Sequence, residues 1–114
     1  MKLRRPPSAK EKKRYLVFRV ISENPVTFSD VKNALMNSII NWMGEKGLSV
    51  SNLRVIRNLW DSGRQEGWVT CTPKSVNDVK MALALIHQIG DSKVIFNVVR
   101  VSGTIKSARE KLVE

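Results

Sequence analysis

The fold is decided by one stretch, Tyr15-Leu16-Val17-Phe18-Arg19-Val20-Ile21, which is rich in β-branched and aromatic side chains. A bounded run of this length and composition predicts a β-strand. The polar residues 22–25, which include a proline, follow directly and end the strand. The remaining elements can be assigned by working outward from this strand.

Downstream of this strand, the apolar spacing changes to that of a helix. Phe28, Val31, Leu35, Ile39 and Trp42 recur on one helical face until glycines 44 and 47, so a helix is predicted there. Two strands, 53–60 and 67–72, are predicted to form a hairpin around the turn residues 61–65. A second helix capped by Ser75 and ending at Gly90, a strand over 93–101 and a short helix over 104–114 complete the chain.

The order strand, helix, strand, strand, helix, strand predicts an α+β fold. Its simplest arrangement is a ferredoxin-like, RNA-recognition-motif-like two-layer sandwich. We expect a four-stranded antiparallel sheet of spatial order 4-1-3-2, with both main helices on one face. Residues 1–13 are predicted to be a flexible basic N-terminal arm, and residues 14–114 a single domain that includes the C-terminal helix.

The first and last predicted strands are apolar on both faces. A sheet covered by helices on one side should alternate apolar and polar residues. One face of the two strands carries Leu16, Phe18, Val20, Val94, Phe96 and Val98, and the other carries Tyr15, Val17, Ile21, Ile95, Val99 and Val101; the sequence leaves open which face meets a partner. The candidate partner-protein interface is Tyr15, Val17, Ile21, Ile95 and Val99. Two possibilities remain for what covers the second apolar face: the C-terminal helix alone, or a partner protein with or without that helix.

The net charge of +10 predicts an anionic partner. Residues 1–14 hold seven of the 20 Lys and Arg, so nucleic acid is favoured, with a merely solubilising tail as the alternative. Cations that contact an RNA backbone would supply affinity and positioning without reading bases. The candidate RNA-binding residues fall into an arm, a hairpin group and a tail: Arg4, Arg5, Lys10, Lys12, Lys13 and Arg14; Arg54, Arg57 and Arg64; Lys106, Arg109 and Lys111. We expect the arm and the tail to lie at opposite ends of the sheet.

A candidate phosphate-binding turn precedes the predicted C-terminal helix. Ser102, Gly103 and Thr104 combine a glycine with hydroxyl groups at a helix start, where free backbone N–H groups can hold a phosphate. Ordinary helix capping explains the same residues equally well.

The sequence offers no catalytic or metal-binding constellation. His87 is the only histidine, Cys71 is the only cysteine, and the ten acidic residues are scattered singly. Both His87 and Cys71 are interpreted as packing residues, as are the three tryptophans. A lone cysteine without disulfide or zinc spacing fits a reducing, cytoplasmic setting, and no apolar run is long enough to cross a membrane.

Two blocks of sequence resemble a known family. They are Lys13-Arg14-Tyr15-Leu16-Val17-Phe18, followed by Val20-Ile21-Ser22-Glu23, and Arg100-Val101-Ser102-Gly103-Thr104-Ile105-Lys106. In this combination and order the chain resembles the archaeal ribonuclease P protein component 2 family. The resemblance implies a subunit that binds ribonuclease P RNA, pairs with the barrel-fold component 3 and reaches pre-tRNA indirectly. It implies no catalytic residue and no cofactor on the protein, with magnesium used by the RNA; homodimerisation within a larger heteromer stays open.

Two rival hypotheses remain. The chain could be a protein–protein adaptor in a ribonucleoprotein with no RNA contact of its own. It could also be a small enzyme on this fold, such as an acyl phosphatase, although no Arg/Asn phosphate site is recognisable. The RNA-binding subunit is the expected function.

Overall fold

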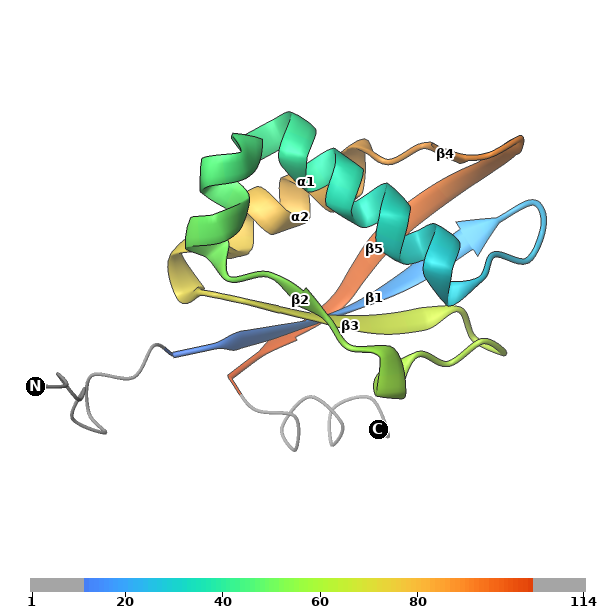
Figure 1. Ribbon diagram of the computed structural model, residues 1–114. Helices are drawn as coiled ribbons and strands as arrows, with labels where there is room; N and C mark the ends of the chain where they lie inside the picture. The colour runs from blue at the N-terminus through green and yellow to red at the C-terminus, as the bar shows by residue number, and fades with distance from the viewer. Residues whose placement is uncertain (1–11, 104–114) are drawn as a thin grey trace, which may run out of the picture.

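The computed structural model describes residues 12–103 and shows two helices packed against an antiparallel sheet (Figure 1). The strands are β1 (Arg14–Ser22), β2 (Arg54–Val55), β3 (Glu66–Cys71), β4 (Gln88–Ile89) and β5 (Ser92–Ser102). The helices are α1 (Phe28–Ser51) and α2 (Val76–Leu85), with short 3₁₀ helices η2 (Arg57–Leu59) and η3 (Pro73–Ser75). The predicted α+β class is confirmed.

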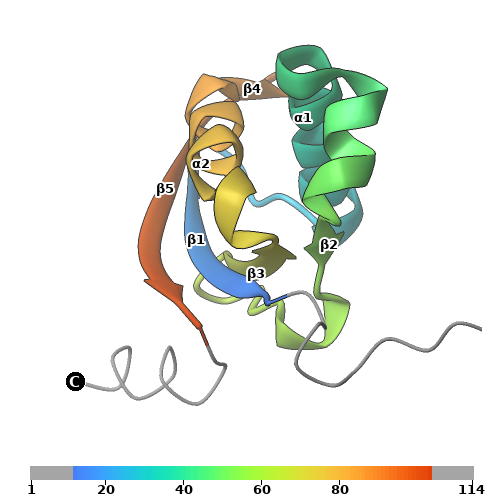
Figure 2. The same ribbon diagram turned by 90° about the vertical axis from the view of Figure 1, so that its left-hand side faces the viewer.

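The strands lie in the order β2-β3-β1-β5-β4, and both α helices cover the same face of the sheet (Figure 2). The spatial order predicted for four strands is confirmed, and β4 is an additional edge strand. It pairs with the first two residues of β5 through a tight turn in which Gly90 adopts a φ of 59°. Two residues are too few to show an alternating pattern, so the sequence did not reveal this strand.

The predicted hairpin is much shorter than expected. β2 pairs with β3 over only Arg54 and Val55, after which the chain turns into η2. Asp61 and Glu66 then exchange backbone hydrogen bonds of 2.9 and 3.1 Å and close the connection. The prediction of a strand over 53–60 was therefore wrong, because the tertiary position of the η2 segment outweighs its strand-like composition.

A β-bulge in β5 changes which residues face the helices. The register between β1 and β5 shifts between Val17 and Phe18, so that Leu16 lies opposite Val101 and Phe18 opposite Val98. An extra residue in one strand reverses the alternation beyond it. Val101 was expected to share a face with Val99, but Val101 packs against the core beneath the helices, whereas Val99 packs in the separate cluster of Val17 and Trp68.

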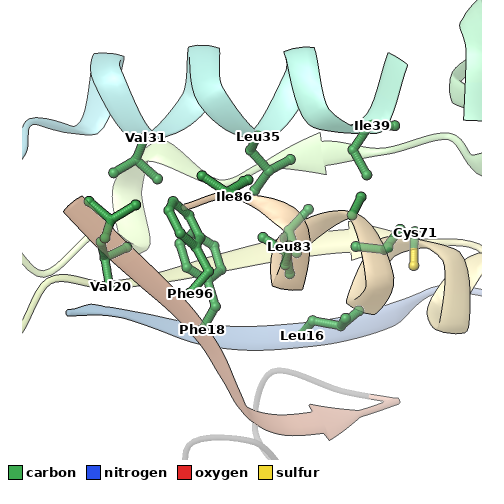
Figure 3. Packing of buried hydrophobic residues seen from close by; sticks show 14 of the residues in the cluster. Leu16, Phe18, Val20, Val31, Leu35, Ile39, Cys71, Leu83, Ile86 and Phe96 are labelled. Carbon is green, nitrogen blue, oxygen red and sulfur yellow. The ribbon is translucent and has the colours of Figure 1, made fainter. Parts of the chain in front are cut away.

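The main core lies between the sheet and the two helices. Figure 3 shows Val31, Leu35 and Ile39 of α1 pointing at the sheet, where the rings of Phe18 and Phe96 stack with centroids 5.6 Å apart. Leu16, Phe18 and Val20 alternate along β1 and are all buried in this cluster. The prediction that Leu16, Phe18 and Val20 share one face of β1 is confirmed, and the structure shows that this face meets the helices. The apolar stripe predicted for α1 is confirmed apart from Trp42, which is 45% exposed, and Phe28, which is half-buried.

Helix α1 is longer than predicted and is kinked. Thr27 caps its start by accepting a hydrogen bond from the backbone N–H of Asp30. Gly44 interrupts it with a φ of 77°, yet the helix resumes and ends only at Asn52, which is in the left-handed conformation. The glycine that was expected to end the helix therefore bends it.

The predicted helix over 104–114 and most of the predicted arm lie outside the described residues. Within residues 12–103, no helix is long and apolar enough to span a membrane.

Candidate nucleic-acid interface

The predicted cations are only partly within the described structure. Lys12 and Lys13 are exposed immediately before β1, and Arg14 is half-buried at its first position. The other candidate cations of the arm and tail lie outside residues 12–103: Arg4, Arg5, Lys10, Lys106, Arg109 and Lys111.

The start of β1 and the end of β5 lie side by side. The two strands are antiparallel, and Tyr15 pairs with Ser102. A Cβ placed on Gly103 would lie 3.6 Å from Nη1 of Arg14. The expectation that arm and tail start from opposite ends of the sheet was wrong, because antiparallel neighbours bring the first residue of one strand beside the last residue of the other. The chain therefore enters β1 and leaves β5 at the same end of the sheet (Figure 1).

Two further cations lie beside the open edge of β5. Lys80 of α2 and Arg100 of β5 line a hollow of about 240 Å³ beside Val98, Val99 and Val101. β4 covers only Ser92 and Lys93, so among the described strands none pairs with this edge beyond Lys93. The sequence reasoning missed Lys80 and Arg100 as candidate RNA contacts, although Arg100 opens the second block quoted for the family resemblance.

The guanidinium of Arg100 has unused hydrogen-bonding capacity. Its Nε atom is buried and has no hydrogen-bond partner within the described chain. A guanidinium only donates hydrogen bonds, and a phosphate oxygen is a fitting acceptor for it. Arg100 pairs with Val17, the fourth residue of β1. This cation therefore lies close to the end of the sheet where Arg14 begins β1.

The arginines of the predicted hairpin are more separate than expected. Arg54 is exposed on β2, whereas Arg57 in η2 stacks its guanidinium over the ring of Phe28 at 5.4 Å from the centroid. Arg64 is exposed, with Nη1 3.8 Å from Oε1 of Glu66. Arg57 and Arg64 thus have intramolecular partners, and only their exposed edges are available to a ligand.

Glu66 is the best-paired acidic group in the described structure. It is buried in β3, and Arg19 of β1 donates to its Oε2 from both Nε and Nη2. Arg19 and Glu66 lie directly opposite each other in the register of β1 and β3. This pairing gives Arg19 a structural role on the face away from the helices.

The candidate phosphate-binding turn is described only in part. Ser102 is buried at the end of β5, Gly103 is exposed, and Thr104 lies outside the described residues. The geometry of the turn therefore remains a prediction.

The five candidate interface residues divide into two groups. Val17 is fully buried with Trp68 in a second apolar cluster, to which Tyr15 and Val99 contribute together with two residues around η2, Ile56 and Leu59. Ile21 and Ile95 lie opposite each other in the register and are 54% and 62% exposed. Of the five, only this second pair is largely exposed; Tyr15 and Val99 are half-buried and Val17 is fully buried.

The groups considered for chemistry are isolated. Cys71 is buried in the core, as predicted, and burial raises the pKa of its thiol from 9.0 to about 11. His87 was expected to pack in the core or at its boundary, but α2 ends at Leu85 and the imidazole is exposed. Residues 12–103 contain no group of three His, Cys, Asp or Glu side chains that could hold a metal ion.

Comparison with known proteins gives consistent matches. A model described as the Rpp14/Pop5 family matches residues 14–113. Ribonuclease P protein component 2 of Pyrococcus furiosus is 37% identical over 106 residues, which cover 93% of this chain and 87% of that protein. The protein of the same name from Methanosarcina mazei is 33% identical over 108 residues, with coverages of 95% and 90%.

A solved structure shares the fold. One chain in a cryo-EM structure of yeast ribonuclease MRP superposes with a TM-score of 0.64 over 92% of this chain and 88% of that chain. The sequence identity is 9%, so this likeness concerns the fold alone.

Proposed function

Since this chain belongs to the Rpp14/Pop5 family, we propose that it is a protein subunit of ribonuclease P that binds and supports the catalytic RNA in the 5′ maturation of pre-tRNA. Its architecture is then a variant of the ferredoxin-like, RNA-recognition-motif-like sandwich in which β4 is an added edge strand. The subunit itself would work in the cytoplasm without a cofactor, and the partner RNA would use the magnesium.

One observation carries the RNA-binding part of this proposal. Arg14, Arg100 and Lys80 lie at or near the end of the sheet where β1 begins and β5 ends. This clustering of positive charge suits the phosphates of an RNA backbone. Base stacking on the sheet is disfavoured, because Trp68 is buried.

The protein partner is proposed to be the barrel-fold component 3. The exposed pair Ile21 and Ile95 supports a protein contact, since both side chains leave apolar surface in water. The same pair also supports the alternative function, an adaptor in the ribonucleoprotein without RNA contact. Contact with pre-tRNA would be indirect in both cases, and a homodimer within the larger assembly remains a further proposal for the same surface.

Salt dependence separates RNA binding from the adaptor role. The double variant Lys80→Ala/Arg100→Ala should bind ribonuclease P RNA more weakly and with a shallower salt slope. The logarithmic slope should fall by about 0.7 to 0.9 for each phosphate that the variant no longer neutralises. The control Lys32→Ala/Lys46→Ala removes the same charge from exposed positions of α1 and should leave the slope nearer the wild-type value. Equal slopes for both variants would refute the proposed contact.

Reconstitution tests the function itself. Cleavage of pre-tRNA by the cognate RNA should be stimulated at limiting magnesium by this chain together with component 3. No stimulation would contradict the proposal, whereas stimulation that the RNA-binding variants leave intact would favour the adaptor.

A further inference from the structure

A second surface feature, separate from the cationic end of the sheet, is a groove between α1 and the segment after α2. It has a volume of about 580 Å³, and its walls are formed by α1 between Asp30 and Trp42 and by residues 85–90. Figure 2 shows the β4 segment passing from the end of α2 across to α1. The groove thus runs between a helix and an edge strand.

Small side chains form the middle of the α1 wall. Ala34 and Ser38 are one helical turn apart on α1. Asp30 lies one turn before them and Trp42 one turn after them. Ser38 Oγ donates a 2.6 Å hydrogen bond to the carbonyl oxygen of Ala82, which fixes this wall against α2. The indole Nε1 of Trp42 donates to Oδ1 of Asp78 at 3.1 Å, so the exposed ring is oriented at one end of the groove.

Three carboxamides line the groove in a regular row. Asn33, Asn37 and Asn41 are exposed, and none of their side chains has a hydrogen-bond partner in the described structure. Positions four apart on an α-helix rise by about 6 Å. Alternate residues of an extended chain are about 6.5 Å apart, and each carboxamide carries both a donor and an acceptor. The row therefore matches the repeat of an extended peptide backbone.

The opposite wall offers a backbone N–H donor and C=O acceptor, the same pair of hydrogen-bonding groups that each carboxamide carries. The backbone N–H of Val94 donates to the carbonyl of His87 at 3.0 Å, and Ile89 pairs with Ser92. In an antiparallel ladder the residue between two such pairs directs its own N–H and C=O to the other side. Gln88 thus presents a backbone donor and acceptor at the outer edge of β4, which lines the groove.

The charge of the groove distinguishes the class of ligand. No Lys or Arg is among the described residues that line it, although the chain carries a net charge of +10. Asp30 places a carboxylate there instead, which disfavours the phosphates of a nucleic acid. Trp42 and Leu85 are 45% and 51% exposed and supply apolar contact area.

We propose that this groove binds an extended peptide segment of a partner protein. The segment adds to the edge of β4 at Gln88, and Asn33, Asn37 and Asn41 hydrogen-bond alternate peptide units along its other side. An apolar side chain of the segment packs on Trp42 and Leu85. The proposal is independent of the RNA-binding function, since Lys80 and Arg100 do not line this groove.

The probe for the test is a phage-displayed library of linear twelve-residue peptides, selected on the full wild-type chain. The triple variant Asn33→Ala/Asn37→Ala/Asn41→Ala takes no part in the selection and is used only to measure binding of the selected peptides. Alanine favours an exposed helix more than asparagine does, so the triple variant should keep its fold, which circular dichroism checks. Synthetic copies of the selected peptides should bind the triple variant at least tenfold more weakly by calorimetry. The matched control Asn77→Ala, on α2 and outside the groove, should change affinity less than twofold.

Two further readouts identify the binding mode. N-methylation of alternate peptide amides should abolish binding while methylation of the intervening amides is tolerated, and bound peptide should slow hydrogen exchange at the Gln88 amide. The proposal is overturned if no peptide distinguishes the wild-type chain from the triple variant, or if the bound peptides are helical. It is also overturned if a twelve-nucleotide oligouridine, and no peptide, binds in a manner that depends on the three asparagines.

Discussion

At the scale of single residues, the pairing of Arg19 with Glu66 stabilises the outer face of the sheet. The carboxylate of Glu66 is buried and accepts two hydrogen bonds from Arg19, whereas Arg64 approaches it only to 3.8 Å from an exposed position. Both arginines interact with the carboxylate of Glu66, so the contributions of the two interactions to stability can be compared directly.

The variant Arg19→Ala should lower the free energy of unfolding by about 1 to 3 kcal/mol, because it leaves the buried carboxylate without its main donors. Arg64→Ala should cost less than about 0.5 kcal/mol, since exposed ion pairs contribute little. Urea denaturation measures both values. Equal changes in the two variants would show that the Arg19 hydrogen bonds do not stabilise the fold.

The thiol of Cys71 predicts a pH dependence of stability. In the unfolded chain it ionises near 9.0, whereas burial raises its pKa in the folded chain to about 11. Between these values the unfolded state binds fewer protons, so the thiol makes the stability of the folded state fall as pH rises. The stability difference between wild type and Cys71→Ala should therefore shrink from pH 9 to pH 11. Urea denaturation at several pH values tests this, and a constant difference would contradict it.

At the scale of elements, the kink in α1 depends on one glycine. Gly44 has φ 77° and ψ 172°, a backbone conformation that is essentially restricted to glycine. The kink allows the last turns of the helix to continue to Ser51, where the chain enters β2.

Gly44→Ala should lower the free energy of unfolding by about 1 to 3 kcal/mol, because the added Cβ strains this conformation. The open space around the position means that the destabilisation would come from the backbone and not from a clash. Gly63→Ala in the exposed turn before β3, where φ is not positive, should stay within about 0.5 kcal/mol of wild type. Thermal and urea denaturation compare the two, and a Gly44→Ala protein as stable as wild type would show that the kink relaxes freely.

At the scale of the whole molecule, the two faces of the sheet are covered differently. The helices cover one face, while the other carries the buried pair Val17 and Trp68 and the exposed pair Ile21 and Ile95. The exposed pair is the part of the predicted interface that a partner could contact without displacing any described residue.

The variant Ile21→Thr/Ile95→Thr keeps β-branched side chains in the strands but removes apolar contact area. It should fold with nearly wild-type stability and bind component 3 at least tenfold more weakly in a calorimetric titration. Val50→Ser removes a comparably exposed side chain from α1 and should bind normally. Unchanged binding by the double threonine variant would place the partner on another surface.

The sequence by itself determined the order of the two main helices and the four main strands, the residues that share one face of β1 and of α1, and the family. Each of these depends on the spacing of apolar residues and of turn residues within a short segment, which does not require contacts with distant parts of the chain. The buried state of Cys71 also followed from its place in an apolar strand.

The tertiary structure alone decided what depends on register between distant segments. The bulge that turns Val101 inward, the two-residue strand β4 and the meeting of Arg14 with Gly103 all arise from pairing between strands or from their packing. The same holds for Lys80 and Arg100, which lie on different elements but line one hollow. Backbone hydrogen bonding fixes such registers only when the strands and helices pack around a common core, so no single segment of the sequence encodes them.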